Sequence, residues 1–478
     1  MKLKEILNIE FDSRFADLEI CGVTSDSRTV RENYAFVCID GTVNDGHKYA
    51  LKAVENGATI IIAQRDTGAE NQIIVEDTHA VYAQMCAAYF GNPANDLKII
   101  GVTGTNGKTS TTYILKGILE KLGHKTGVIG TIQNLVGDEV LPAKNTTPDA
   151  FELHSLLSIM LKSSCEYVLM EVSSHALDQK RVWGLEFDAA ILTNITQDHL
   201  DYHKTFDNYV AAKQKIFDMC KNAVINFDDS ICREISKDTK NICSTYTYSI
   251  HSNESTFTAK NVRHRASGSD FEFVGNGVIG RAKLNIPGEF SVYNAMGAIT
   301  ALVALGFPFA NILSALPDVK SIKGRAEIVP TNTDYTVIID YAHTPDGLEN
   351  ILKTFTKFEN HRIVTLFGCG GDRDRTKRPI MGEIAAKYSD FCIVTSDNPR
   401  NEQPAAIIDD ITAGMVGCKT PYVVIENRVQ AIEYAIENAK TNDIIILAGK
   451  GHETYQILAD GTIHLDEREV IAKALSDK

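Results

Sequence analysis

The sequence lacks a long apolar run, a closely spaced cysteine pair and an excess of basic residues. No stretch approaches the roughly 20 apolar residues that span a bilayer, which argues against membrane insertion. The ten cysteines include no Cys-x-x-Cys pair, so neither a zinc site nor a disulfide framework is indicated. Residues 1–6 lack the apolar core of a signal peptide, and we therefore expect a cytoplasmic protein.

Charge and length narrow the function further. A formal net charge of −14 argues against a general nucleic-acid binder, although local basic clusters can still hold an anionic small molecule. With 478 residues, the chain is too long for one hydrophobic core and suggests about three domains. Its 44% hydrophobic and 23% charged residues are ordinary for a globular protein, so small-molecule chemistry is favoured.

The chain is organised around residues 99–110, where an apolar run is followed by a glycine-rich turn, a lysine and two hydroxyls. Such a turn between a buried strand and an amphipathic helix lets backbone N–H groups converge on a phosphate. Lys108 offers a charge to the phosphates, and Thr109 or Ser110 can ligate Mg²⁺. The match to the general P-loop is imperfect, because Val102 stands where a glycine is usual. An ordinary strand–turn–helix therefore remains the alternative.

Two further apolar runs, residues 167–170 and 189–194, lead into acidic and imidazole side chains. The first leads to Glu171, and the second to a polar segment that contains His199. Ligands of open α/β sheets gather at the carboxyl ends of strands, so both groups should lie on one rim with the glycine-rich turn. Each alone is more often a cap or a surface residue, but together they favour a Mg²⁺ site.

The N-terminal region contains a weaker signal. Residues 1–96 alternate strands and helices, which predicts a small α/β domain. Within it, Ser25, Ser27 and Arg28 could hold a substrate phosphate or sugar. Turn capping explains the same three residue types equally well.

The middle region contains two patterns that periodicity alone does not assign. Residues 209–217 have helical spacing, which places Tyr209, Lys213 and Phe217 on one face. A lysine between aromatic residues on such a face usually only packs its aliphatic chain against them and has no special role. Residues 244–285 read as antiparallel strands that form a sheet appended to the middle domain.

From about residue 323, three predicted strands end in mixed charges at one edge. A second glycine-rich turn carries Arg373 in place of Lys-Thr, residues 396–400 contain another arginine, and residues 449–453 contain Lys450 and Glu453. The planar fork of arginine suits carboxylates or phosphates. This edge would fit a zwitterionic ligand such as an amino acid, while ordinary turn chemistry is the alternative.

Taken in order, these motifs resemble those of the Mur ligase family, and the resemblance covers all three regions. The absence of a glycine at residue 102 is itself the Mur form of the loop. The motifs that carry the resemblance are residues 26–28, 45–47, 104–109, 171–175, 194–203, 209–217, 324–325, 340–343, 370–373 and 397–400.

The resemblance implies an α/β fold with the three-domain Mur ligase architecture. We expect a small N-terminal α/β domain (residues 1–96) that binds a UDP-muramoyl substrate. A central ATPase domain (97–322) should have a P-loop-type, mostly parallel sheet with an appended antiparallel sheet. A C-terminal Rossmann-like α/β domain (323–478) should bind an amino acid.

The resemblance also implies the reaction. ATP phosphorylates the substrate carboxylate, an amine attacks the acyl phosphate, and an amide, ADP and phosphate result. The catalytic residues implied are Lys108, Glu171, His199 and Lys213. The residues implied for ATP are Gly104, Thr105, Asn106, Gly107, Lys108, Thr109, Ser110, Asn294, Arg325, Asp340 and His343. The ligands implied for Mg²⁺ are Thr109, Glu171, His199 and Lys213, the last as a carbamate.

Both remaining substrates are implied in the same way. Family members that add the third peptide residue act on UDP-N-acetylmuramoyl-L-alanyl-D-glutamate. For this substrate the match implies Ser27, Asn145, Thr146, Thr147, Ser173, Gln179 and Arg181. Members that add meso-diaminopimelate carry Asp-Asn-Pro-Arg, as this chain does. For that amino acid the residues implied are Arg373, Asp397, Asn398, Pro399, Arg400, Gly449 and Glu453.

Other functions stay open at this point. The same ligase could add L-lysine, and a non-enzymatic nucleotide-binding regulator would share the phosphate loop. Folylpolyglutamate and cyanophycin synthetases belong to the same superfamily, but the Asp-Ser-Arg segment and the Asp-Asn-Pro-Arg segment argue against both. We expect a monomer that binds neither nucleic acid nor membrane.

Overall fold

A computed structural model describes residues 1–41, 44–265, 268–356 and 361–476. The chain packs as two compact units. The first comprises residues 1–258, 275–278 and 296–315, and the second comprises residues 259–274, 279–295 and 316–478. Within the described ranges, no helix is both long and apolar enough to cross a bilayer.

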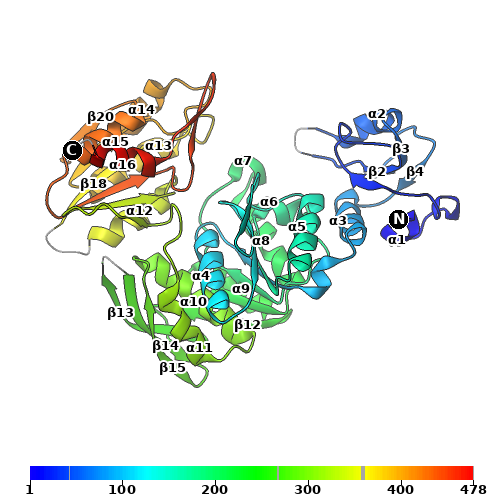
Figure 1. Cartoon of the computed structure of the whole chain (residues 1–478), viewed down its shortest axis with the longest axis horizontal. Coiled ribbons are helices and arrows are strands. Elements are labelled where there is room, and N and C mark those ends of the chain that lie inside the picture. The colour runs from blue at the N-terminus through cyan, green and yellow to red at the C-terminus, as the bar shows by residue number, and fades with distance from the viewer. Residues whose placement is uncertain (42–43, 266–267, 357–360, 477–478) are drawn as a thin grey trace. The chain divides into compact units, whose positions relative to one another are not determined.

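A four-stranded parallel sheet forms the N-terminal part of the first unit, in the order β1-β2-β3-β4. Helix α2 covers one face of this sheet, and α1 and α3 cover the other (Figure 1). The β-α-β alternation predicted for this region is therefore present. The strands are β1 (Gly22–Thr24), β2 (Tyr34–Val37), β3 (Ala58–Ala63) and β4 (Gln72–Ile74). The helices are α1 (Leu3–Ile6), α2 (Ala50–Glu55) and α3 (Thr78–Tyr89), with 3₁₀ turns at Ser13–Phe15, Gly46–Tyr49 and Pro93–Asp96.

The central sheet of the first unit has the order β12-β11-β10-β5-β9-β6-β7-β8. It is parallel from β12 to β6, and its β7 and β8 edge is antiparallel. The strands are β5 (Lys98–Thr103), β6 (Thr126–Ile129), β7 (Asn134–Val136), β8 (Glu139–Leu141), β9 (Tyr167–Glu171), β10 (Ala189–Leu192), β11 (Asn222–Asn226) and β12 (Ser244–Ser249). The helices are α4 (Lys108–Lys121), α5 (Ala150–Lys162), α6 (Ser174–Asp178), α7 (Leu200–His203), α8 (Phe206–Gln214), α9 (Ser230–Thr239) and α11 (Phe309–Ala315), with a 3₁₀ turn at Lys215–Met219.

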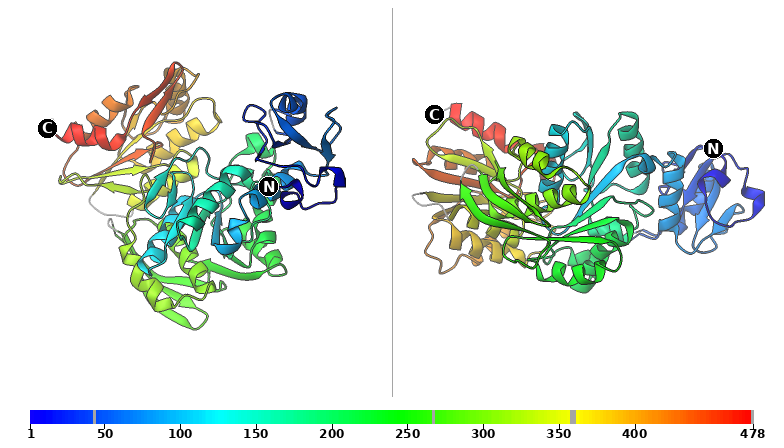
Figure 2. Two further views of the ribbon diagram at one scale, coloured as in Figure 1. Left: turned by 45° about the vertical axis from the view of Figure 1, so that its right-hand side comes forward. Right: turned by 90° about the horizontal axis from the view of Figure 1, so that it is seen from below.

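The prediction for residues 244–285 was wrong in part. Strand β12 pairs with β11 in parallel, because helix α9 returns the chain to the same edge of the sheet. The first residues of β13 (Phe257–Arg265) then pair with β12, also in parallel. Alternating polar and apolar residues mark a strand but not the direction of its partner. Strands β13, β14 (Gly268–Gly275) and β15 (Val278–Leu284) lie side by side (Figure 2, green). Helix α10 (Glu289–Ala304) follows these strands.

The C-terminal sheet has the order β16-β17-β21-β18-β19-β20, with only β16 antiparallel. Helices α12, α13 and α14 pack on one face, and α15 and α16 pack on the other (Figure 1). The strands are β16 (Glu327–Val329), β17 (Thr336–Asp340), β18 (Arg362–Phe367), β19 (Phe391–Val394), β20 (Tyr422–Val424) and β21 (Asp443–Ala448), followed by the hairpin β22 (Tyr455–Leu458) and β23 (Gly461–His464). The helices are α12 (Pro345–Thr356), α13 (Lys377–Tyr388), α14 (Pro404–Ala413), α15 (Arg428–Glu437) and α16 (Glu467–Ser476), with a 3₁₀ turn at Leu316–Asp318.

Helix α5 carries a buried histidine that the predicted chemistry does not use. His154 is 1% exposed, and neither of its ring nitrogens has a hydrogen-bond partner among the described residues. Burial lowers the pKa of His154 to about 4. The imidazole is therefore neutral in the folded chain at pH 6, whereas in the unfolded chain it is largely protonated.

We predict that the first unit loses about 3 kcal/mol of stability through His154 as the pH falls from about 7 to 4. The unfolded chain binds the extra proton in this range, so the folded state is favoured above it. His154→Leu should flatten this slope. Urea unfolding can be followed through Trp183, the single tryptophan of the chain. The exposed His361→Leu serves as the control, and an unchanged slope in His154→Leu would contradict the assignment.

Candidate active site

The glycine-rich turn lies where the sequence predicted it, at the carboxyl end of β5, between β10 and β9. Gly104 has φ +141°, and a Cβ there would overlap the Thr193 hydroxyl. Gly107 has φ +88° and is the N-cap of α4. The first backbone N–H groups of a helix attract anions, so this turn has the geometry of a phosphate site.

The end of β10 holds the turn in place. Thr193 Oγ1 donates to the Asn106 carbonyl at 2.6 Å. Asn194 accepts from Asn106 N at 2.9 Å through Oδ1, and it donates to the Asn106 carbonyl at 3.1 Å through Nδ2. Thr105 N donates to the Asn194 carbonyl at 2.9 Å. The end of β10 thus supplies four hydrogen bonds that shape the loop.

Glu171 lies at the end of β9, beside the turn. It is 1% exposed, and its Oε2 accepts from the hydroxyls of Thr109 and Thr131, both at 2.9 Å. Its Oε1 accepts from Thr131 N at 3.0 Å. The predicted carboxylate and the predicted Mg²⁺-ligating hydroxyl are therefore in direct contact.

Two lysines converge on one oxygen of the turn. Lys108 Nζ and Lys213 Nζ each donate to the Gly104 carbonyl at 2.9 Å. Lys213 is 2% exposed, and its ammonium lies 4.6 Å from the centre of the Tyr209 ring. Burial, and then the charge of Lys108, hold the pKa of Lys213 well below its usual value. The predicted shared face is confirmed for Tyr209 and Lys213, whereas Phe217 lies beyond α8 in the 3₁₀ turn.

His199 lies at the rim of the same region as the N-cap of α7, with φ +52°. Its ring centre is 4.8 Å from that of His175, and its Nε2 is 3.4 Å from Asp198 Oδ2. Burial lowers the pKa of His199, and it lowers the pKa of His175 to about 4. Both rings are therefore neutral near pH 7. The sequence had marked His199 but assigned no role to His175.

The residues implied for Mg²⁺ differ in the donor atoms that they offer to a metal. In the described part of the chain, no group of three or more His, Cys, Asp or Glu side chains is placed to hold a metal. The touching oxygens of Thr109 and Glu171 nevertheless suit Mg²⁺, which takes few protein ligands and prefers substrate phosphates and water. The site fits a metal that is bound together with a nucleotide.

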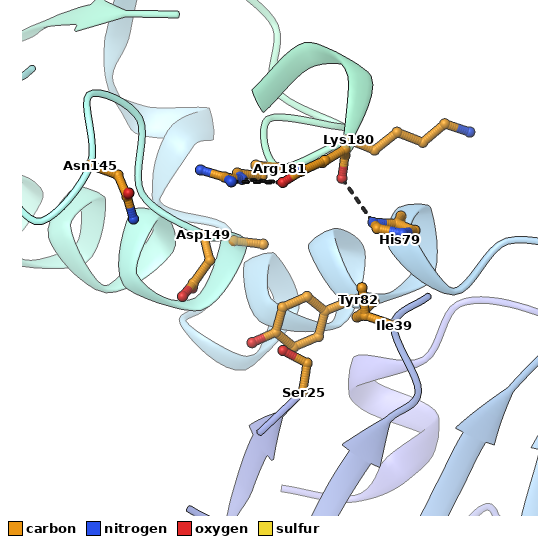
Figure 3. A pocket seen from close by; sticks show the side chains of 10 residues that line it. Ser25, Ile39, His79, Tyr82, Asn145, Asp149, Lys180 and Arg181 are labelled. Atoms are coloured by element: carbon orange, nitrogen blue, oxygen red, sulfur yellow. Dashed lines mark hydrogen bonds between the residues drawn. The ribbon is translucent and has the colours of Figure 1, made fainter. Parts of the chain in front are cut away.

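A pocket of about 280 Å³ opens between α3 and the segments that precede α5 and follow α6 (Figure 3). The His79 ring is hydrogen-bonded to the Gln179 carbonyl at 3.0 Å, and the Gln179 side chain accepts from Arg181 Nη2 at 2.6 Å. The lining residues are Ser25, Ile39, His79, Tyr82, Asn145, Asp149, Ala150, Gln179, Lys180 and Arg181.

Three of the residues implied for the UDP-muramoyl substrate line this pocket: Asn145, Gln179 and Arg181. Thr147 is linked to the pocket, because its carbonyl accepts from Arg181 Nη1 at 2.8 Å and its Oγ1 accepts from Ser173 N at 3.0 Å. Thr146 shares a 3.0 Å hydrogen bond with Thr131.

Ser27 does not line the pocket, and Ser25 takes that place. Among the other lining residues, His79 and Tyr82 had not been expected. Their i, i+3 spacing on α3 was the available signal, and it is common to many helices.

In the second unit, Asp340 ends β17 and accepts from Ala326 N at 2.6 Å and Ala342 N at 2.8 Å. Burial raises the pKa of Asp340, and the charge of Arg325 opposes this rise. Arg325 lies over the Tyr341 ring at 4.6 Å. Arg325, Asp340 and His343, three of the residues implied for ATP, are thus neighbours in sequence or in space. The carbonyl of His343 accepts a hydrogen bond from Lys377 Nζ at 2.8 Å. Asn294 is buried on α10.

The residues implied for the amino acid gather at the carboxyl ends of β18, β19 and β21. Arg400 Nη1 donates to the Gly371 carbonyl at 2.8 Å, and Gly371 N donates to the Asn398 carbonyl at 2.9 Å. Arg373 Nη1 donates to the carbonyl of its neighbour Asp372 at 3.0 Å. Gly449 has φ +116°, and a Cβ there would lie 2.7 Å from Asp397 Oδ2.

Glu453 has a cationic partner that the sequence reasoning did not assign. Its Oε2 accepts from Lys450 Nζ at 2.7 Å and from Asn398 Nδ2 at 3.0 Å. Glu453 therefore has hydrogen-bond partners within the chain itself.

Three protein-family models match the chain. The model described as "Mur ligase middle domain" matches residues 102–302. The description "Mur ligase, glutamate ligase domain" matches residues 324–451, and "Mur ligase family, catalytic domain" matches residues 19–90.

Individual proteins show the same relationship. The chain is 47% identical over 467 residues to the UDP-N-acetylmuramoyl-L-alanyl-D-glutamate–2,6-diaminopimelate ligase of Clostridium botulinum, covering 96% of both chains. A solved structure of a ligase of that name has a TM-score of 0.73 and 30% identity, covering 100% of this chain and 99% of the other. The folylpolyglutamate synthase of Mycobacterium tuberculosis shares the fold at 18% identity and a TM-score of 0.63, covering 76% of this chain and 91% of that one.

The fold, the glycine-rich turn and these matches together define the class of protein, which is an ATP-dependent, ADP-forming ligase. Within that class, the chain belongs to the Mur ligase family.

We predict that Gly104→Ala weakens ATP binding by about 10- to 100-fold, because forcing a side chain into this conformation costs about 1–3 kcal/mol. The new Cβ would also displace Thr193. Isothermal titration calorimetry with ATP measures the effect. The matched control is Gly123→Ala, since Gly123 has φ +91° but no atom within 4 Å of its added Cβ. Equal ATP affinity in both variants would contradict the assignment.

Proposed function

We propose that this chain joins meso-diaminopimelate to the D-glutamate of UDP-N-acetylmuramoyl-L-alanyl-D-glutamate, with ATP hydrolysed to ADP and phosphate, in peptidoglycan synthesis. The observation that carries this proposal is the full-length similarity to ligases of that name, together with the Asp-Asn-Pro-Arg turn after β19. L-lysine is the competing amino acid. A non-enzymatic regulator is the competing class, and it would release no ADP in response to both substrates.

The chemistry proposed requires negative charges to approach one another. Lys108 and the N-terminus of α4 would neutralise the transferred phosphoryl group, as is general for such transfers. Thr109 and Glu171 would hold Mg²⁺, with His199 near a second ion. The metal would supply charge neutralisation on the phosphate oxygens. Near pH 7 the neutral ring of His199 keeps a lone pair for this purpose.

The remaining site assignments belong to the same proposal. The loop residues 104–110 would bind the ATP phosphates, and Asn294, Arg325, Asp340 and His343 would bind the rest of the nucleotide. The pocket beside Arg181 would take the UDP-muramoyl dipeptide, with Ser27, Thr146, Thr147 and Ser173 completing its contacts. The domain boundaries at residues 96 and 322, a monomeric state and a cytoplasmic location are part of this proposal too.

Lys213 is proposed to react with carbon dioxide. Its depressed pKa supports this, because only a neutral amine adds to CO₂. The ammonium first loses one proton. The neutral nitrogen then forms a bond to the carbon of CO₂ as one C=O π bond opens, and a second proton leaves the nitrogen. A cation near Lys108 is thereby replaced by an anion. A carbamate beside Lys108 would pair with its charge and could support Mg²⁺.

We predict that Lys213→Ala lowers kcat by about 100-fold or more, since the anion beside the phosphate loop is lost. Acetate or formate should restore part of this activity, and bicarbonate should not. The matched control is Lys215→Ala, because Lys215 is exposed and pairs with Asp178 at 2.8 Å. ADP release measures each rate. Full activity of Lys213→Ala in the presence of both substrates would refute the carbamate role.

The selectivity for diaminopimelate is proposed to depend on Arg400. Diaminopimelate carries a second carboxylate beside its second ammonium, whereas the side chain of L-lysine ends in an ammonium alone. An arginine left without its carboxylate forfeits about 1.5–3 kcal/mol of charge-assisted hydrogen bonding. Arg373 would assist on the neighbouring turn, with Asp397, Asn398, Pro399 and Gly449 shaping the pocket around the ligand.

We predict that Arg400→Ala lowers kcat/KM for meso-diaminopimelate by about 10- to 100-fold and leaves the low value for L-lysine nearly unchanged. A panel of amino acids in the ADP-release assay measures both. The matched control is Arg375→Ala, whose side chain is exposed and pairs with Asp410 at 3.0 Å. If the parent chain ligates L-lysine as efficiently as meso-diaminopimelate, this assignment is wrong even if the ligase activity is present.

A further inference from the structure

A fully buried lysine lies among the residues proposed for the amino acid. Lys450 is 0% exposed and follows β21 after Gly449. Its Nζ donates to Asn398 Oδ1 at 3.0 Å and to Glu453 Oε2 at 2.7 Å. Asn398 Nδ2 donates to the same Glu453 oxygen at 3.0 Å, which closes a ring of three side chains.

Fold stability alone does not account for this cation. A buried ion pair usually stabilises a fold no better than apolar residues of similar size. The two strand ends are also already joined by another buried cation, Arg428, which donates to the carbonyls of Ala448 at 2.9 Å and Ser396 at 3.4 Å. Arg428 has its own buried partner, Glu467, at 2.8 Å. Lys450 thus joins the same two loops a second time, through its hydrogen bonds to the side chains of Asn398 and Glu453.

The hydrogen bonds fix what Asn398 and Glu453 can offer a ligand. Asn398 Oδ1 accepts from Lys450 and from Ile457 N at 3.0 Å, so both of its lone pairs are used. The amide can then present only N–H to a ligand, which suits a carboxylate. Both Glu453 contacts are made by Oε2, which assigns a ligand ammonium to Oε1.

From this geometry we infer that Lys450 is a positioning residue for the amino-acid substrate. It holds the Asn398 amide in its donor orientation and keeps the Glu453 carboxylate turned toward the ligand's ammonium. This inference rests on the proposed function and adds a selectivity role. Without Lys450, the Asn398 oxygen keeps only its hydrogen bond from Ile457 N, and Glu453 loses its cationic partner. The Asn398 amide is then held less firmly in its donor orientation, so that a ligand with a carboxylate end group loses part of its binding advantage over one with a simple amine.

The test compares Lys450→Met with the parent chain, because methionine has a similar length and no charge. We expect the KM for meso-diaminopimelate to rise by about 10- to 100-fold, as for a displaced binding group. The KM values for ATP and for UDP-N-acetylmuramoyl-L-alanyl-D-glutamate should stay within about twofold. The preference for meso-diaminopimelate over L-lysine should narrow. Lys473→Met, at an exposed position on α16, is the matched control.

Each outcome decides the matter. An unchanged KM and preference in a folded Lys450→Met would overturn the inference, as would a parallel rise in all three KM values. If Lys450→Met does not fold, Lys450→Gln takes its place, because glutamine is polar but shorter and uncharged. In a folded Lys450→Gln, a rise in KM confined to meso-diaminopimelate supports the inference, and an unchanged KM rejects it. A parent chain that ligates no amino acid refutes the proposed function itself, which distinguishes the two failures.

Discussion

Two ammonium groups share one carbonyl oxygen, that of Gly104, and the central site depends on this contact. Burial opposes the charged form of Lys213, and the nearby charge of Lys108 opposes it further. The depressed pKa of Lys213 is the consequence. The arrangement requires Gly104 in a conformation that only glycine adopts easily, with Thr193 packed where a Cβ would be. The loop, the buried lysine and the end of β10 therefore form one interdependent unit.

The C-terminal candidate site also contains buried cationic side chains, but there each of them is paired with a carboxylate. The buried side chains of Arg428 and Lys450 have Glu467 and Glu453 respectively as their carboxylate partners. Arg428 joins the backbone of two strand ends, and Lys450 joins the side chains at the same ends. The Arg428–Glu467 pair therefore fixes the backbone of the strand ends, whereas the Lys450–Glu453 pair orients side chains that are proposed to contact a ligand.

Strand ends account for much of what these sites have in common. In both mostly parallel sheets the candidate site residues lie at or just beyond the end of a buried strand, since Glu171 is the last residue of β9 and Asp397 follows β19. Apolar strand runs bring such positions to one edge, whatever the loops contain. The long-range hydrogen bonds that Asn194 Nδ2 donates to the Asn106 carbonyl and Lys450 Nζ donates to Asn398 Oδ1 then set the side-chain directions.

The sequence by itself determined the alternation of strands and helices, the phosphate turn and the residue types at each strand end, because these depend on local periodicity and glycine placement. It could not decide that β12 pairs with β11 in parallel, since the alternation of polar and apolar residues is the same for a parallel and an antiparallel strand. Nor could it decide that His79 from α3 meets the turn at Gln179, that Ser25 rather than Ser27 lines the pocket, or that Lys450 pairs with Glu453. Those are contacts between side chains from separate elements, and packing distance and burial exist only after the chain has folded.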